Sequence, residues 1–82
     1  MERIAIAGNI EAPIYKLLLD KGFKISIESE HWVAKGEDFE AIADNIIELA
    51  GIIYLKENKG KNWKVGDDVI DNYVDFLKMN EK

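Results

Sequence analysis

The order of apolar and polar residues predicts two strands and a helix in the first third of the chain. Residues 3–7 and 23–27 both alternate between apolar and small or polar side chains, the pattern of a strand with one covered face. Between them, Pro13 is typical of a first helical turn and Gly22 of a residue that ends a helix, so we expect a helix over 13–21. A strand, a helix and a strand in this order predict a right-handed parallel crossover.

The next segment predicts a hairpin. We expect extended chain over 30–35, a turn at 36–38, where Gly36 is followed by two acidic residues, and an antiparallel return over 39–43. The pattern leaves open whether 23–35 is one bent strand or two.

Two further helices are expected in the second half. Asn45 is a good N-cap residue, Glu48 follows three positions later as in a capping box, and Gly60 predicts the end of this helix. The last helix is expected to begin at Gly66, followed by acidic residues that suit the positive end of the helix dipole. Its expected buried side consists of Val69, Ile70, Tyr73, Val74, Phe76 and Leu77.

A second interpretation of the middle of the chain stays open. The apolar residues of 39–50 also fit helical spacing, in which case Gly51 would end a helix and 52–55 would form a further parallel strand. That arrangement would be a small doubly wound sheet.

The chain has 82 residues, which is room for one domain, and we expect 1–82 to fold as a single compact unit. Hydrophobic residues make up 48% and charged residues 33%, enough for a packed core under a charged surface. The expected fold class is α/β of the α+β type. It is a two-layer sandwich with a mixed sheet of three or four strands and three helices on one face, in the order β-α-β-β-(β)-α-α.

Charge and cysteine content exclude several classes of function. Sixteen acidic residues against eleven basic ones give a net charge of −5, which repels phosphate backbones and argues against nucleic-acid binding. The absence of cysteine excludes disulfides, thiolate metal sites and thiol nucleophiles, and it indicates a reducing cytoplasm. No apolar run approaches the roughly 20 residues of a membrane span, so we expect no membrane partner.

Few residues could carry catalysis. His31 is the single histidine, and Ser29 would share its face of a strand, where neighbouring side chains stand side by side in poor geometry for a proton relay. No spacing of His and carboxylates is typical of a metal site. We therefore expect no catalytic residue, no metal and no cofactor.

The turn at Gly8 and Asn9 is the candidate ligand site, because a turn between a strand and a helix can aim backbone N–H groups at a phosphate. The order strand, Ala7-Gly8, helix, Gly22-Phe23, strand over 3–27 resembles the start of Rossmann-like nucleotide- and nucleoside-processing enzymes, including the deoxyribosyltransferase-like group. The resemblance implies a small-ligand or nucleotide site at this turn. The further glycines of the dinucleotide fingerprint are absent.

Two surfaces are candidates for binding a protein. Continuous alternation places Trp32 opposite Ile42 on the open face of the sheet, where an exposed tryptophan would anchor a partner. A bulge in the strand would instead turn Trp32 into the core. On the last helix, Asp68, Asp71 and Asp75 share one side, either as an acidic stripe kept for a basic partner or as an ordinary solvated face.

Together these observations predict a small, acidic, non-catalytic interaction module that binds a protein partner or a second copy of itself. It would use the open sheet face or the acidic last helix. Immunity and toxin-neutralising proteins are analogous in size and charge only. The alternative function is a minimal Rossmann-like binder or enzyme for a small ligand at Gly8 and Asn9.

Overall fold

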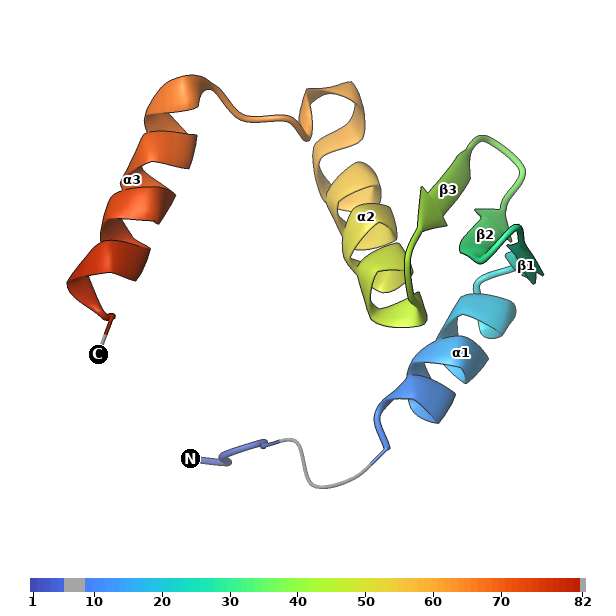
Figure 1. Cartoon of the computed structure of the whole chain (residues 1–82). Helices are drawn as coiled ribbons and strands as arrows, with labels where there is room; N and C mark the ends of the chain where they lie inside the picture. The colour runs from blue at the N-terminus through green and yellow to red at the C-terminus, as the bar shows by residue number, and fades with distance from the viewer. Residues whose placement is uncertain (6–8, 82) are drawn as a thin grey trace.

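The computed structural model describes residues 1–5 and 9–81, and it shows a three-stranded sheet with three helices (Figure 1). The expected α+β fold class is confirmed. The elements are α1 (Glu11–Asp20), β1 (Lys24–Glu28), β2 (His31–Lys35), β3 (Glu40–Ala43), α2 (Ile46–Lys59), the 3-10 turn η1 (Gly60–Asn62) and α3 (Asp67–Met79).

The three strands form an antiparallel sheet in the order β1-β2-β3. The segment 23–35 is therefore two strands, joined by a two-residue turn at Ser29 and Glu30 with φ values of 51° and 71°. Both central residues of a type I′ turn need positive φ, which explains how so short a loop reverses the chain. The expected turn at 36–38 is confirmed, and there the Gly36 N–H donates to the Phe39 carbonyl at 3.0 Å.

Helices α1 and α2 pack on one face of the sheet and enclose the core (Figure 1). Across the strands, Ile25 pairs with Ala34 and Ala34 with Ala41, and both alanines are buried. Small side chains at the centre of this face let α2 lie close to the strands. The core cluster consists of Leu18, Phe23, Ala34, Ala41, Ile46, Leu49 and Ile53.

Local hydrogen bonds fix the ends of α2 as the sequence predicts. The Asn45 side chain accepts from the Glu48 N–H at 2.8 Å, and the Glu48 carboxylate accepts from the Asp44 N–H at 3.1 Å. The first bond satisfies one of the N–H groups that a helix start leaves unpaired, and the second ties the residue before the N-cap to the first turn. Gly60 ends the helix with φ of 60°. The alternative helix over 39–50 is wrong, because its first half is strand β3.

Three details differ from the expected arrangement. Residues 3–5 form no strand, and residues 6 and 7 of the expected first strand lie outside the described residues. Within the described chain the sheet is antiparallel throughout, so the parallel crossover from 3–7 to 23–27 is absent. Helix α3 forms where expected but does not join the sheet: among the described residues, no Cα of α3 lies within 8 Å of a Cα of α1, α2 or a strand.

Candidate interaction surface

Helix α3 has the local signals of a stable helix end at each terminus. Gly66 is the N-cap, and Asp67 and Asp68 stand in the first turn, where carboxylates interact favourably with the helix dipole. Lys78 stands in the last turn, and the Asn80 side chain donates to the Phe76 carbonyl at 2.9 Å. These features account for a helix at this place in the sequence, but they do not account for what it packs against.

The side of α3 that the sequence predicts to be buried is exposed in the structure. Tyr73 is 61% exposed and Phe76 58%. We call this surface the α3 apolar face, and it consists of Val69, Ile70, Tyr73, Val74, Phe76 and Leu77, all exposed. Because such residues recur every three or four positions, they cover one continuous side of the helix.

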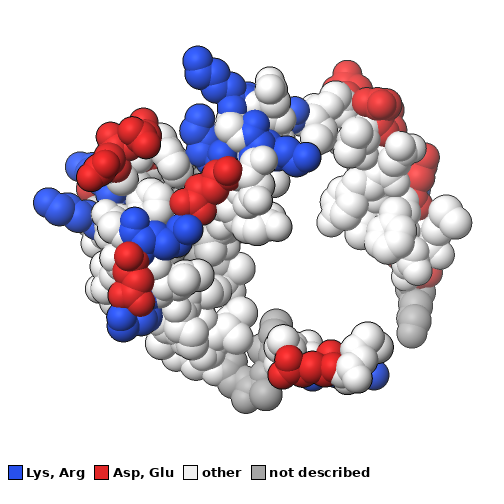
Figure 2. Space-filling view, turned by 180° about the vertical axis from the view of Figure 1, so that it is seen from behind, with Lys and Arg blue, Asp and Glu red and all other residues white. Residues whose placement is uncertain are grey.

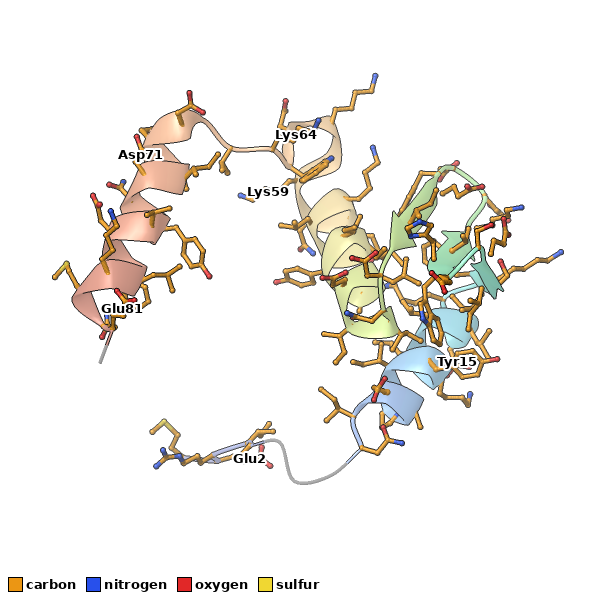
Figure 3. All side chains as sticks on the ribbon, in the orientation of Figure 1. Glu2, Tyr15, Lys59, Lys64, Asp71 and Glu81 are labelled. Carbon is orange, nitrogen blue, oxygen red and sulfur yellow. The ribbon has the colours of Figure 1, made fainter. Side chains whose placement is uncertain are left out.

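The acidic stripe Asp68, Asp71 and Asp75 lies on the opposite side of α3. At 100° per residue, these three carboxylates centre about 180° from the α3 apolar face. Figure 2 shows acidic atoms along the outer edge of α3 and uncharged atoms toward the hollow of the molecule, and Figure 3 draws Asp71 on the outer side. A partner that covers the α3 apolar face would therefore leave the stripe in solvent.

Helix α2 carries a second apolar stripe that does not face the sheet. Its buried residues Ile46, Leu49 and Ile53 point toward the core. We call the outward side the α2 outer stripe, and it consists of Ile47, Gly51, Tyr54 and Leu55, all exposed. A helix that is apolar on two opposite sides is typical of one with two packing partners.

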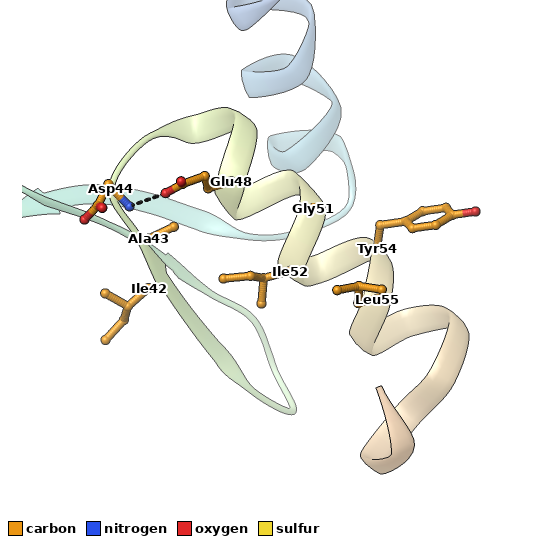
Figure 4. Close-up of a pocket in the computed structure, with 8 residues that line it drawn as sticks. All are labelled: Ile42, Ala43, Asp44, Glu48, Gly51, Ile52, Tyr54 and Leu55. Carbon is orange, nitrogen blue, oxygen red and sulfur yellow. Dashed lines mark hydrogen bonds between the residues drawn. The ribbon is translucent and has the colours of Figure 1, made fainter. Parts of the chain in front are cut away.

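A groove of 740 Å³ runs beside this stripe, between α2 and β3 (Figure 4). We call it the β3–α2 groove. Its acidic end is at the start of α2, where Asp44 and Glu48 are joined by the capping hydrogen bond. The rest of its wall is apolar or small: Ile42, Ala43, Gly51, Ile52, Tyr54 and Leu55.

The predicted pairing of Trp32 with Ile42 on the open face is wrong. The register places Trp32 opposite Ile27 and Ala43, and its side chain is partly buried against the core cluster. Two turns cause the difference. The turn at Ser29 and Glu30 restarts the alternation and places Trp32 on the core face without a bulge. Between the paired Lys35 and Glu40 lie four residues, 36–39, where a three-residue turn was expected, and this moves the partner of Trp32 from Ile42 to Ala43. Ile42 does lie on the open face, opposite Val33, and it is 55% exposed.

The structure describes the predicted ligand turn only from Asn9 onward. Gly8 lies outside the described residues. The Asn9 side chain accepts a hydrogen bond from the Glu11 N–H at 2.9 Å, so its carbonyl oxygen is used at the start of α1. The carboxylate of Glu11 in that first helical turn would repel an anion placed there.

The remaining candidate chemistry is dispersed over the surface. The His31 Nδ1 lies 3.6 Å from an Asp44 carboxylate oxygen, and both side chains are more than half exposed. The Lys64 ammonium lies 5.5 Å from the centre of the Trp63 ring, in the linker between α2 and α3. Over residues 1–5 and 9–81, no three His, Cys, Asp or Glu side chains are placed to hold a metal ion.

Comparison with protein-family models, with curated proteins and with solved structures finds no match for this chain. No helix in the described part of the chain is long and apolar enough to cross a membrane.

Sequence reasoning missed the α2 outer stripe as a surface. In the sequence, Ile47, Tyr54 and Leu55 only widen the apolar side of a single helix. The available signal was the width of the pattern: apolar residues surround α2, and one sheet covers only one side of a helix.

Proposed function

We propose that this protein is a non-catalytic interaction module that binds a protein partner through the α3 apolar face. The observation that supports the proposal is the exposure of six apolar side chains along one side of α3, a helix with no Cα within 8 Å of a Cα of any other helix or strand in the described chain. Soluble proteins rarely leave so continuous an apolar surface uncovered unless it binds something. An amphipathic helix laid into an apolar groove is a common mode of protein recognition.

Charge favours a protein over a membrane surface as the partner. Amphipathic helices that lie on membranes usually carry Lys and Arg on their polar side, which attract anionic lipids. The polar side of α3 carries Asp68, Asp71 and Asp75 instead, and the whole chain has a net charge of −5. Anionic headgroups would repel this helix, whereas a protein groove would not.

A pair of photo-cross-linking variants tests the proposal. A photoreactive amino acid at Tyr73 stands in the α3 apolar face, and the same group at Asp71 stands on the opposite side of the same helix. We expect protein adducts, with another protein or with a second copy, from position 73 in cells and few from position 71. Equal yields from both positions would contradict the proposal.

A thermal-shift screen separates this function from small-ligand binding at Asn9. A ligand with a Kd of about 10 µM, present at about 1 mM, would raise the free energy of unfolding by about 2.7 kcal/mol. We expect nucleotides and sugar phosphates to leave the melting temperature unchanged. A clear shift with one of them, together with no adducts from position 73, would favour the ligand-binding alternative.

A further inference from the structure

We infer that the partner is a second copy of this chain: α3 of each copy packs against the α2 outer stripe and the β3–α2 groove of the other, forming a symmetric dimer with exchanged helices. This inference depends on the proposed function, and it identifies the protein that the α3 apolar face binds. Reciprocal packing of this kind closes on itself, as two-fold dimers do.

The surface area of the chain fits a dimer of this kind. A compact monomer of 9.4 kDa exposes about 5,000 Å², whereas this chain exposes 7212 Å². The excess is about 2,200 Å² per chain, to which α3 and the exposed residues 1–5 both contribute. Half of it from each of two chains, about 2,200 Å² in total, already lies within the roughly 2,000–5,000 Å² that obligate homodimers bury. The radius of gyration agrees, since it is 15.4 Å against about 12 Å for a compact chain of this length.

The two apolar surfaces match each other in length, and the α2 outer stripe has open space at its middle. The α3 apolar face spans 69–77 and the α2 outer stripe 47–55, each about 12 Å along its helix axis. In the middle of the stripe, a Cβ built on Gly51 would meet no atom within 4 Å. A second helix can therefore approach the backbone of α2 closely at this residue.

The charges at the helix ends favour antiparallel packing. The start of α2 is acidic, with Asp44 and Glu48, and its last turn is basic. Helix α3 begins with Asp67 and Asp68 and has Lys78 in its last turn. Placed antiparallel, each acidic end of one helix lies beside the basic end of the other, and the helix dipoles also oppose each other.

The conformation of the linker favours packing of α3 against a second copy over packing against α2 of its own chain. From Gly60 to Gly66 the chain makes one 3-10 turn and then leads α3 away from α2 (Figure 1). Trp63 and Val65 line a groove of 820 Å³ together with Leu55 of α2 and with Val69, Ile70 and Tyr73 of α3, so the space between these residues is open within one chain. The α3 apolar face and the α2 outer stripe of one chain are thus open at the same time.

Sedimentation equilibrium of the full chain with three single variants tests the inference. We expect the wild type to sediment at twice the 9.4 kDa chain mass. Tyr54→Lys in the α2 outer stripe and Tyr73→Lys in the α3 apolar face should each give the mass of one chain. Asp71→Lys, on the outer side of α3, is the matched control and should stay dimeric. The two tyrosines are 67% and 61% exposed, so we expect the circular dichroism of all variants to match that of the wild type.

Cross-linking provides a second measurement that does not depend on how the lysine variants fold. Because the chain has no cysteine, Tyr54→Cys and Tyr73→Cys each introduce the single thiol of its chain. After the two variants are unfolded and refolded together, a bismaleimide should join one chain of each kind. A chain that carries both cysteines and becomes linked only within itself would show that α3 folds back on its own α2.

The other outcomes separate the two proposals. A monomer whose α3 amides exchange freely with deuterium would overturn the second copy as partner and leave the proposed function standing. A monomer whose α3 amides are protected would overturn both, because its own chain would then cover the α3 apolar face. A dimer that survives Tyr54→Lys or Tyr73→Lys would overturn the exchanged-helix interface.

Discussion

Replacing Gly51 with alanine should stabilise the single folded chain and weaken the association of two chains. Gly51 lies inside α2, is exposed, and has no atom within 4 Å of the position of an added Cβ. Within one chain the new methyl group therefore meets nothing, while alanine removes the backbone entropy cost of a helical glycine. We expect the free energy of unfolding to rise by about 0.5–1 kcal/mol, which corresponds to a melting temperature higher by about 2–8 °C.

In the dimer the same methyl group would stand where α3 of the second copy approaches. Adding a methyl group to a close helix contact costs about 1–3 kcal/mol. We therefore expect the dissociation constant of the dimer to increase by about 5- to 150-fold.

Two measurements separate these effects. Urea unfolding in the Tyr73→Lys background, in which α3 is not docked, should show the gain in stability from Gly51→Ala alone. Sedimentation equilibrium of Gly51→Ala in the otherwise unchanged chain should show weaker association. A loss of stability in the Tyr73→Lys background would refute the view that the space beside Gly51 is open. An unchanged dissociation constant would refute the approach of α3 to this residue.

Three further substitutions test the fold. Leu49→Ala removes a fully buried side chain of α2 and should lower the free energy of unfolding by about 2–5 kcal/mol in urea titrations. Asn45→Ala removes the side-chain bond to the Glu48 N–H, and the loss should be about 0.5–2 kcal/mol by the same measurement. Glu30→Gly relieves a positive φ of 71° and should raise the melting temperature, by about 4–8 °C for each kcal/mol gained.

Elements that depend on neighbouring residues were predictable from the sequence. The cap at Asn45, the end of α2 at Gly60 and the start of α3 at Gly66 all occur at the expected residues. Each depends on a bond or a dihedral angle within a few positions, so local residue types contain the necessary information.

The orientation of Trp32 was not predictable in this way. It depends on the turn at Ser29 and Glu30, which has neither the glycine nor the asparagine that a type I′ turn usually takes. Without glycine or asparagine at this turn, the sequence predicts one continuous alternation through 23–35. A shift of one residue moves every later side chain to the other face.

The strand expected over 3–7 and the last helix show a different limit of sequence reasoning. Apolar alternation over 3–7 and the apolar spacing of α3 both indicate that these side chains are to be covered. Ile4 is 85% exposed and the α3 apolar face is open, so the described chain covers neither Ile4 nor that face. The spacing of apolar residues indicates that one side of an element should be buried, but it does not indicate which other element covers that side.

This limit bears directly on function. If the apolar pattern of α3 encodes burial, and α2 in the same chain has an uncovered apolar side of equal length, then the sequence encodes both halves of one interface. Two halves on one chain can meet within it or between two copies, with nearly the same contacts in either case. The linker decides between these arrangements, because only its conformation differs between them. Changes to 60–66 that alter its length should therefore change the oligomeric state while leaving the interface residues untouched.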